Sequence, residues 1–311
     1  MSRDVPRVSV GLAVFNGEDY VAEAIDSVLG QTYEDFELVI SDNASTDQTE
    51  EICRAYAAMD PRVRYFRNDH NIGGANNENR TFLLSRGEYF RWLGHDDRFA
   101  APLLAESVAV LDAEPSVVLC HTQVILIDAD GNEIGLLDRN RAASEKARER
   151  FCQLTGWDHG CEELYGLIRS DVMHKTRLQP NYTDSDRTLL AQLSLYGRFY
   201  QIPKPLFYRR IHQQGSTHVY PEWRERMAWF FPDMSQSKIT MPHWSQFLHY
   251  LEVISHAPIS VSERMGCYSH MVSWLLNKNG RSMAKDLLLA TAGILHRPLK
   301  AVQRVQRGTN T

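Results

Sequence analysis

Short apolar runs alternate with amphipathic segments along the first hundred residues. The apolar runs, each of strand length, cover residues 8–14, 36–41, 63–66 and 89–93. Residues 20–29 and 49–58 carry apolar side chains at helical spacing, and Ser45, Thr46 and Asp47 offer an N-cap for the second helix. This alternation predicts an α/β fold in which a mainly parallel central sheet is flanked by helices.

The pattern changes after Pro102. It predicts a helix to about residue 111, an apolar strand over 117–127, a helix over 186–196 and an extended segment over 199–211. Residues 138–150 are charged and lack a core period, so we expect a mobile loop there that acts as a lid or faces a substrate. From residue 221 onward, Trp, Met, His and Leu recur at helical spacing. We therefore expect one α/β domain over residues 1–220, with halves at about 1–115 and 116–220, and a helical C-terminal extension over 221–311.

Composition excludes several classes of protein. The formal charge of -5 is mild, and no long Lys/Arg block interrupts the first two thirds of the chain, so nucleic acid is not an expected partner. The five cysteines are odd in number and never form C-x-x-C, which argues against a disulfide framework and against zinc. Because we find neither a secretory signal nor a stretch long enough to span a bilayer, we expect a cytoplasmic protein with reduced thiols.

Polar residues follow the apolar runs at the places where the strands should end. Ligands of open α/β sheets gather at the carboxyl ends of the strands, where this chain places Asn16, Asp42, Asp96 and Asp97. The Asp42 carboxylate is a candidate acceptor for a ring N–H of a nucleotide base. An alternative is that Asp42, Ser45 and Asp47 only form an Asx turn and cap the next helix.

The adjacent acids Asp96 and Asp97 predict a cation site. Two neighbouring carboxylates repel each other unless a cation lies beside them, and hard oxygen ligands suit Mg²⁺ or Mn²⁺ bound together with substrate phosphates. The alternative is a solvated acidic loop that caps the following helix.

Six segments in order, rather than any one of them, carry a resemblance to a known family. They lie at residues 8–16 (VSVGLAVFN), 24–32 (AIDSVLGQT), 41–49 (SDNASTDQT), 71–73 (NIG), 86–89 (RGEY) and 95–97 (HDD). Over residues 7 to about 216, two thirds of the chain, the sequence resembles the family 2 glycosyltransferases of the GT-A fold. The resemblance implies an inverting enzyme that takes a sugar from a nucleotide diphosphate sugar.

The resemblance also implies which residues bind the donor and the metal. The segment like Phe15-Asn16 and the acid like Asp42 hold the nucleotide, and Asp96 fills the metal-binding place of a D-x-D motif whose first acid is here Gly94. His212 resembles a family histidine near the diphosphate, with Arg209 or Arg210 steadying phosphate charge. The expected donor-binding set is Ala13, Phe15, Asn16, Glu18, Asp42, Asn71, Gly73, His95, Asp96 and Arg210. The expected ligands of a divalent Mn²⁺ or Mg²⁺ ion are Asp96, Asp97 and His212.

An acidic pair at a helix start carries the catalytic base in that family. Here Asp186 takes the place of the base, Ser185 replaces the first acid, and Asp184 is the fallback. Residues 184–186 can also be read simply as a helix cap. The implied mechanism is a single displacement in which Asp186 removes the proton of the acceptor hydroxyl. The first half of the domain would then bind the nucleotide sugar and the second half the acceptor.

Other functions stay open as alternatives. A nucleotidyltransferase shares the layering and the metal requirement but would need a Gly-rich phosphate loop with Lys or Arg after the first strand. A nucleotide-sugar binding protein without catalysis would fit the missing acids at positions 94 and 185. A dehydrogenase is disfavoured because no G-x-G-x-x-G follows the first strand. The expected acceptor is a glycan, lipid-linked or cell-envelope precursor, as in polysaccharide biosynthesis. The basic residues Lys300, Arg304 and Arg307 suggest peripheral contact with the cytoplasmic face of a membrane.

Overall fold

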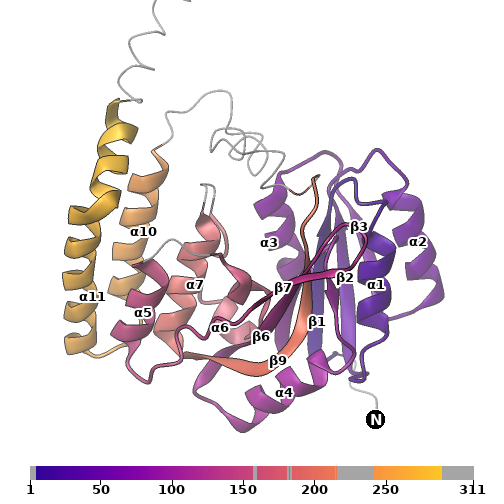
Figure 1. Cartoon of the computed structure of the whole chain (residues 1–311), viewed down its shortest axis with the longest axis horizontal. Helices are drawn as coiled ribbons and strands as arrows, with labels where there is room; N and C mark the ends of the chain where they lie inside the picture. The colour runs from indigo at the N-terminus through magenta and orange to yellow at the C-terminus, as the bar shows by residue number, and fades with distance from the viewer. Residues whose placement is uncertain are drawn as a thin grey trace, which may run out of the picture.

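The architecture was analysed in a computed structural model of the chain, which describes residues 5–156, 160–180, 182, 184–213, 215 and 241–288. These residues form a nine-stranded sheet with helices on both of its faces and a pair of helices at one side (Figure 1). The predicted combination of a GT-A-type α/β fold and C-terminal helices is therefore present.

The first half of the sheet is parallel. Its elements are β1 (Val8–Val14), α1 (Val21–Leu29), β2 (Phe36–Asp42), α2 (Thr49–Met59), β3 (Val63–Arg67), α3 (Gly74–Leu84) and β4 (Tyr89–Gly94). The strand order is β3-β2-β1-β4 with all three pairings parallel, so the carboxyl ends of these strands meet at one edge. The four strands predicted from the apolar runs are confirmed to within one residue at each end.

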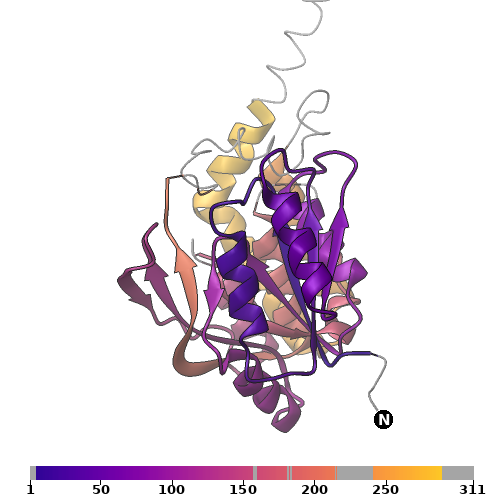
Figure 2. The same cartoon turned by 90° about the vertical axis from the view of Figure 1, so that its right-hand side faces the viewer.

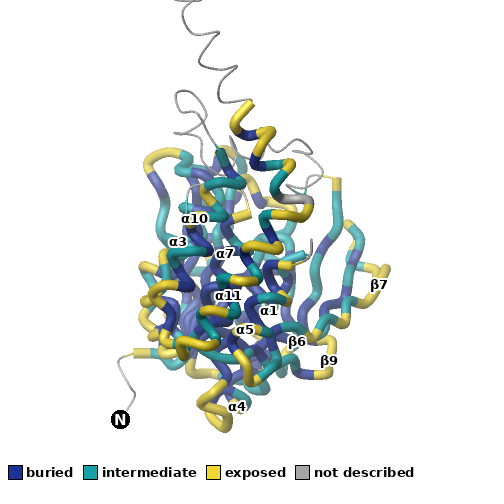
Figure 3. The backbone as a smooth tube through the Cα atoms, turned by 90° about the vertical axis from the view of Figure 1, so that its left-hand side faces the viewer, coloured by how far each residue is buried: buried dark blue, intermediate teal, exposed yellow. Residues whose placement is uncertain are grey.

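Helices cover this parallel sheet on both faces, which is why every residue of β2 is buried. α1 packs on one face through Val21, Ala24, Ile25 and Val28. α3 covers the other face, where Phe82 meets the ring of Phe90 edge to face. Figure 2 looks onto the face that α1 and α2 cover. Figure 3 shows the buried interior of the protein and the exposed strand β7 at its edge.

The second half of the sheet mixes strand directions. It contains β5 (Arg98–Phe99), α4 (Leu103–Ala113), β6 (Val117–Ile127), β7 (Glu133–Leu137), α5 (Ala147–Thr155), a 3-10 turn η1 (Glu162–Tyr165), β8 (Leu167–Arg169), α6 (Ser170–Met173), α7 (Ser185–Tyr196) and β9 (Arg198–Arg210). The short strand β8 lies antiparallel between β4 and β6, and β9 runs parallel to β6. The pairing of β6 with β9 shifts register close to Pro203 and Pro205, as expected of residues that donate no ladder hydrogen bond.

The charged segment 138–150, predicted to be a mobile loop, is anchored to the rest of the protein. α5 begins at Ala147, and the side chain of Arg150 is buried. Its guanidinium donates to the carbonyl oxygen of Ser194 in α7 at 2.7 Å and to two carbonyls of its own segment. The predicted loop is present over residues 138–146, but residues 147–150 form the first turn of α5. The expectation was wrong for Arg150 because backbone carbonyls satisfy a charge that the sequence pattern marked as solvent-facing.

The C-terminal helices pack on the second half of the domain. α10 (Pro242–His256) is followed by α11 (Val261–Trp274). α11 continues into a π-helical turn, η3 (Leu275–Asn279), and the helix runs on to residue 288. Tyr250, Ile254 and Trp274 share an apolar cluster with Phe151 of α5 and Leu195 of α7. In the described parts of the chain, none of the helices combines the length and hydropathy that crossing a bilayer requires. The expected domain boundary at residue 220 and the basic residues after 299 lie outside the described residues.

Candidate active site

A cavity of about 590 Å³ opens at the carboxyl ends of the parallel strands. Its walls come from the segments after β1, β2 and β4, from α3, and from residues distant in sequence such as Tyr165 and His212. Of the residues expected to bind the donor or the metal, it is lined by Ala13, Phe15, Asn16, Glu18, Asn71, His95, Asp96 and His212. Asp42, Gly73, Asp97, Asp184, Asp186 and Arg210 do not line it.

The turns after β1 and β2 hold each other in place. The backbone N–H of Asn16 donates to Ser45 Oγ at 2.9 Å, and Asn16 Oδ1 accepts from the N–H of Thr46 at 2.8 Å. Asn16 has a φ of 50°, in the left-handed region that asparagine tolerates better than most residues. Glu18 and Asp47 exchange similar bonds: Glu18 N–H donates to Asp47, and Glu18 Oε2 accepts from the N–H of Gln48. These bonds fix the loop that carries Phe15 into the cavity wall.

Of the three residues predicted to cap α2, Asp47 is the one whose side chain does so. Asp47 Oδ1 accepts from the N–H of Thr49 at 3.1 Å, so one of the three expected residues does satisfy a free donor at the start of the helix. Ser45 instead serves the β1 turn through Asn16.

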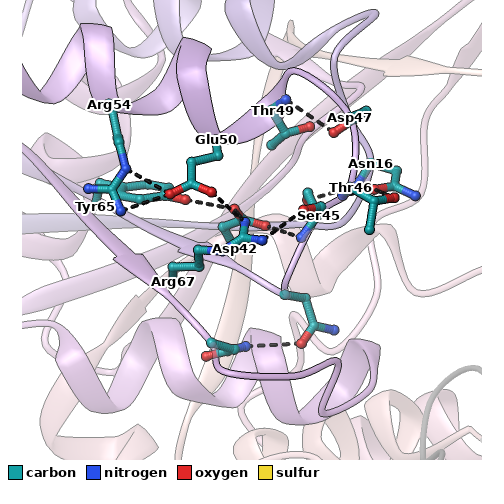
Figure 4. A network of polar contacts seen from close by, with 12 residues as sticks. Asn16, Asp42, Ser45, Thr46, Asp47, Thr49, Glu50, Arg54, Tyr65 and Arg67 are labelled. Atoms are coloured by element: carbon teal, nitrogen blue, oxygen red, sulfur yellow. Dashed lines mark hydrogen bonds and ion pairs between the residues drawn. The ribbon is translucent and has the colours of Figure 1, made fainter.

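Asp42 lies beneath the cavity rather than in its wall. Its carboxylate is completely buried and accepts from Arg67 Nη1 and Tyr65 Oη, each at 2.6 Å, and from the N–H of Ser45 at 2.9 Å (Figure 4). The carboxylate thus ties β2 to β3 and supports the turn. The structure places its neighbour Asn43 in the cavity wall instead.

Two asparagines organise the side of the cavity next to β2. Asn43 Nδ2 donates to Asn71 Oδ1 at 2.9 Å, and Asn43 Oδ1 accepts from the N–H of Ile72. Asn71 Oδ1 also accepts from the N–H of Gly73, whose φ of 88° is a left-handed conformation that glycine adopts without strain. Gly73 therefore shapes the loop before α3 without itself lining the cavity.

Asp96 and His212 come from distant segments and meet in the cavity. Their atoms Oδ2 and Nε2 lie 2.9 Å apart, and the ring of Tyr20 packs edge-on against His212 with centroids 5.1 Å apart. Burial alone would raise the pKa of Asp96, but the hydrogen bond from His212 and the nearby imidazoles hold that pKa below its ordinary value. Asp96 is therefore a carboxylate that keeps its negative charge.

Asp97 faces away from the cavity, although it is adjacent to Asp96. Its Oδ1 accepts from the backbone N–H of Arg210 at 2.9 Å, and the residue is buried. Burial and the neighbouring charge of Asp96 raise the pKa of Asp97 well above its ordinary value. Of the two adjacent acids, Asp96 is the one that reaches the cavity.

Arg210 has a structural position. Its guanidinium donates to the carbonyls of Asp96, Asp128 and Ala129 and forms an ion pair with Glu23. It also lies over the ring of Tyr20, 4.4 Å from the centroid. Because these partners occupy a guanidinium that is only 2% exposed, Arg210 fixes the Asp96 loop and the Tyr20 ring rather than pointing into the cavity.

The start of α7 lies behind the cavity floor. Asp184, in a left-handed conformation with φ 61°, is exposed, whereas Asp186 is partly buried. Asp186 is near Cys161 and Glu78, since its charge helps to raise the pKa of both groups. Glu78 itself lines the cavity, so Asp186 is close to the cavity wall without forming part of it.

Several cavity residues were not predicted from the sequence. They are Tyr20, Asn43, Asn77, Glu78, Trp92 and Tyr165. Asn77 and Glu78 lie on the side of α3 that faces the cavity. Tyr165 belongs to η1, about seventy residues after the end of β4. The proximity of Asn77 and Glu78 to the Asn71 loop was a usable signal, but nothing local marks Tyr165.

The cavity wall is rich in acids. It carries Glu18, Asp19, Asp47, Glu78 and Asp96, and the described lining residues include no Lys or Arg. Within the described residues, no three or more His, Cys, Asp or Glu side chains are arranged to hold a metal ion by themselves. Asp96 and His212 offer one carboxylate and one imidazole, a set that suits Mn²⁺ or Mg²⁺ when substrate phosphates and water supply the other ligands.

The chain is similar to known glycosyltransferases in both sequence and fold. An uncharacterized glycosyltransferase of Rickettsia prowazekii is 30% identical over 265 residues, which cover 80% of this chain and 79% of the relative. Other curated relatives match over shorter segments, and the matched part of this chain spans about half of the length of two of them.

Solved structures share the fold at low sequence identity. S. aureus TarS in complex with UDP-GlcNAc has a TM-score of 0.62 at 16% identity, covering 88% of this chain and 73% of TarS. A mannosyltransferase of Pyrobaculum calidifontis, in complex with GDP-Man and Mn²⁺, has a TM-score of 0.55 at 18% identity and covers 98% of this chain and 81% of its own. The sequence profile described as "Glycosyl transferase family 2" matches residues 9–174, more than half of the chain. The chain therefore belongs to glycosyl transferase family 2.

Proposed function

We propose that this glycosyltransferase is metal-dependent and inverting, and moves a sugar from a nucleoside diphosphate sugar to a hydroxyl acceptor. The observation that carries the proposal is the pairing of Asp96 with His212 in a cavity whose described wall has no Lys or Arg. A diphosphate entering this acidic cavity needs a counter-charge, which a divalent cation at Asp96 would provide. Relatives of the fold bind UDP-GlcNAc, or GDP-Man with Mn²⁺, which supports this donor class.

The residues of the chain would divide the work of binding. Phe15, Asn43 and Asn71 would contact the nucleoside, since they line the cavity where the β1 and β2 turns meet. Asp96 and His212 would hold Mn²⁺ or Mg²⁺. Such an ion supplies Lewis-acid stabilisation of the charge on a leaving diphosphate.

Asp186 would act as the general base. It lies in the first turn of α7, near Glu78 of the cavity wall. In a single displacement it takes the proton of the acceptor hydroxyl while that oxygen attacks the anomeric carbon and the nucleoside diphosphate leaves. The anomeric configuration then inverts. Asp184 is the alternative base, at an exposed position one turn away from Arg187.

The metal requirement can be tested by calorimetry on the Asp96→Ala variant. UDP and GDP, alone and as sugar conjugates, are titrated with Mn²⁺ and then with EDTA. We expect the wild type to bind one nucleotide only with Mn²⁺, and Asp96→Ala to lose that binding while it unfolds at the wild-type temperature. Equal Mn²⁺-dependent affinity in the two proteins would exclude Asp96 as a ligand. Release of nucleoside diphosphate by the wild type, when a suitable acceptor is present, separates an enzyme from a binding protein.

We also propose that the C-terminal region contacts anionic lipid near the acceptor. Val261, Met265, Val272 and Leu276 are exposed at spacings that bring them to one side of α11 and η3. The sequence continues beyond residue 288 with Arg297, Lys300, Arg304 and Arg307, which suit a negative surface. Co-sedimentation with phosphatidylserine vesicles at low salt tests the idea, and absence of binding there would exclude it.

A further inference from the structure

Glu78 is an acid of the cavity wall for which the mechanism above has no use. It lies on α3, and its side chain shares the wall with Trp92 and Tyr165. A carboxyl group at this position is available to bind a ligand in the cavity.

The side chain of Glu78 is held by neighbours that are themselves fixed. Gln179 Nε2 donates to Glu78 Oε2, and Gln179 is buried. Asn79 holds Gln179 by two bonds: Asn79 Nδ2 donates to the Gln179 carbonyl at 2.8 Å, and Asn79 Oδ1 accepts from its N–H at 3.1 Å. The carbonyl of Glu78 accepts from Trp92 Nε1 at 3.0 Å. Both the acid and the indole beside it are thus positioned in advance.

Glu78 has no cationic partner among the described residues, although it is enclosed. Gln179 provides the one hydrogen bond that its carboxyl group accepts there, which leaves Oε1 for a ligand. Burial raises the pKa of Glu78 to about 7, and the charge of Asp186 acts in the same direction. Above that pH the group is ionised, and a carboxylate accepts a hydrogen bond from a neutral hydroxyl and repels a second anion.

Glu78 lines the same cavity as Asp96, the residue proposed to bind the metal. Tyr165 is close enough to both Glu78 and Asp96 for their charges to raise its pKa, so these groups surround the same part of the cavity. Asp186, the proposed base, is near enough to Glu78 for its charge to act on that group. A sugar between a diphosphate at Asp96 and a base at Asp186 would therefore lie against Glu78 and Tyr165.

We propose that Glu78 accepts a hydrogen bond from a hydroxyl of the transferred sugar and selects neutral donor sugars against those that carry a carboxylate. This inference rests on the proposed function, because it assumes that a nucleotide sugar occupies the cavity. It assigns Glu78 to donor specificity and leaves the proton transfer to Asp186.

The test compares neutral and acidic donors in four proteins by calorimetry with Mn²⁺ at about pH 8, where Glu78 is ionised. The pairs are UDP-glucose with UDP-glucuronate and GDP-mannose with GDP-mannuronate, and the variants are Glu78→Gln and Glu78→Ala. Glu51→Gln, a change at an exposed position of α2, is the matched control. We expect the wild type and the control to favour the neutral donor by about tenfold, and Glu78→Gln to reduce that preference to about twofold. Glu78→Ala should also weaken the neutral donor about tenfold, because the hydroxyl loses its acceptor.

Binding of the free nucleoside diphosphate distinguishes a failure of the Glu78 role from a failure of the proposed function. UDP or GDP should bind all four proteins with the same affinity within about twofold, which also shows that the variants are folded. If the nucleotide binds normally but Glu78→Gln keeps the full preference for the neutral donor, the role of Glu78 is refuted and the proposed function stands. If the wild type binds neither nucleotide with Mn²⁺, the proposed function itself fails.

Discussion

Gly94 shows how a missing side chain shapes the metal end of the cavity. A Cβ at this position would lie 2.7 Å from Asp97 Oδ2 and 2.9 Å from Asp96 Oδ1, closer than real Cβ contacts. The two carboxyl groups therefore occupy the space in which an acid at position 94 would begin. The departure from the D-x-D motif is accompanied by a different arrangement of the remaining acids.

Gly94→Ala should consequently weaken Mn²⁺-dependent nucleotide binding about tenfold or more, because Asp96 must move away from His212. Gly135→Ala is the matched control, since a Cβ there meets Leu126 Cδ1 at an ordinary 3.6 Å. Calorimetry with Mn²⁺ measures both. Unchanged affinity of Gly94→Ala would show that the pairing of Asp96 with His212 is not needed for binding.

At this scale the sequence predicted positions better than side-chain directions. Asp42 and Asp96 were both expected at strand ends, and both are there. Only Asp96 reaches the cavity, because the Asp42 carboxylate accepts hydrogen bonds from Tyr65 and Arg67 on the neighbouring strand β3. Such partners are more than twenty residues away in sequence, and single-sequence patterns do not reveal which neighbour a carboxylate will choose.

The first turn of α7 carries the prediction for the catalytic base. Asp186 is the second residue of α7, and its Oδ1 accepts from the N–H of Arg187 at 2.8 Å. Asn can keep that hydrogen bond but cannot take a proton, so Asp186→Asn separates the structural role from the catalytic one. We expect nearly unchanged stability and nucleotide affinity, with transfer slowed about 100- to 10,000-fold. Rates of nucleoside diphosphate release with a working donor and acceptor measure the effect. Full activity in Asp186→Asn, with loss in Asp184→Asn, would assign the base to Asp184.

A buried acid at the opposite edge of the sheet joins β2 to β3 and to the turn before β4. Glu37 accepts from Arg64 Nη1 at 2.7 Å, from Arg86 Nη2 at 2.8 Å and from Ser9 Oγ at 2.6 Å. Burial would raise the pKa of Glu37, but these bonds together hold it below the ordinary value. The charged form is therefore the one that the fold stabilises.

Glu37→Gln should lower the free energy of unfolding at pH 7 by about 2 to 3 kcal/mol. This loss is smaller than the loss expected when a fully buried ion pair is broken, because the side chains of Arg64 and Arg86 are partly exposed to solvent. Since the pKa of Glu37 is lower in the folded state, its contribution is present above the unfolded pKa and is lost as pH falls through the folded one. Urea unfolding from pH 7 downward should therefore show the gap between wild type and variant closing. Glu133→Gln, at an exposed position of β7, is the control. A gap that widens in acid would contradict this linkage.

At the scale of elements, the spacing of apolar residues predicted the helices and strands correctly wherever those residues pack in the core. β1 and β2 are buried along almost their whole length because helices cover both faces of the sheet, and the apolar runs within them predicted their limits. The start of α5 did not follow, since Arg150 is buried through hydrogen bonds to backbone carbonyls that only the folded chain brings close. The placement of β8 between β4 and β6 likewise depends on long-range pairing.

For the whole molecule, the cavity and the C-terminal helices belong to different cores. The parallel strands pack with α1 in one apolar cluster, whereas α10 and α11 share another with α5 and α7. α7 connects the two parts, because its first turn carries Asp186 and its later residues Ala191 and Leu195 pack toward α10 and α11. The helical extension therefore supports the helix that holds the proposed base.

Trp274 is the residue at which this support can be tested. Its ring is buried, stacks on Phe247 with centroids 5.8 Å apart and meets Tyr250 edge-on at 6.0 Å. Trp274→Ala should lower the free energy of unfolding by about 3 to 5 kcal/mol, measured by urea denaturation, because a large aromatic leaves a cavity that helices fill poorly. Val272→Ala, whose side chain is exposed on the same helix, should change it by less than about 0.5 kcal/mol. Nucleotide affinity with Mn²⁺ should stay at the wild-type value in both variants, since the cavity lies at the other core. A Trp274→Ala protein of full stability would show that the C-terminal helices add little to the fold, whereas a selective loss of nucleotide binding would show that the two cores are coupled.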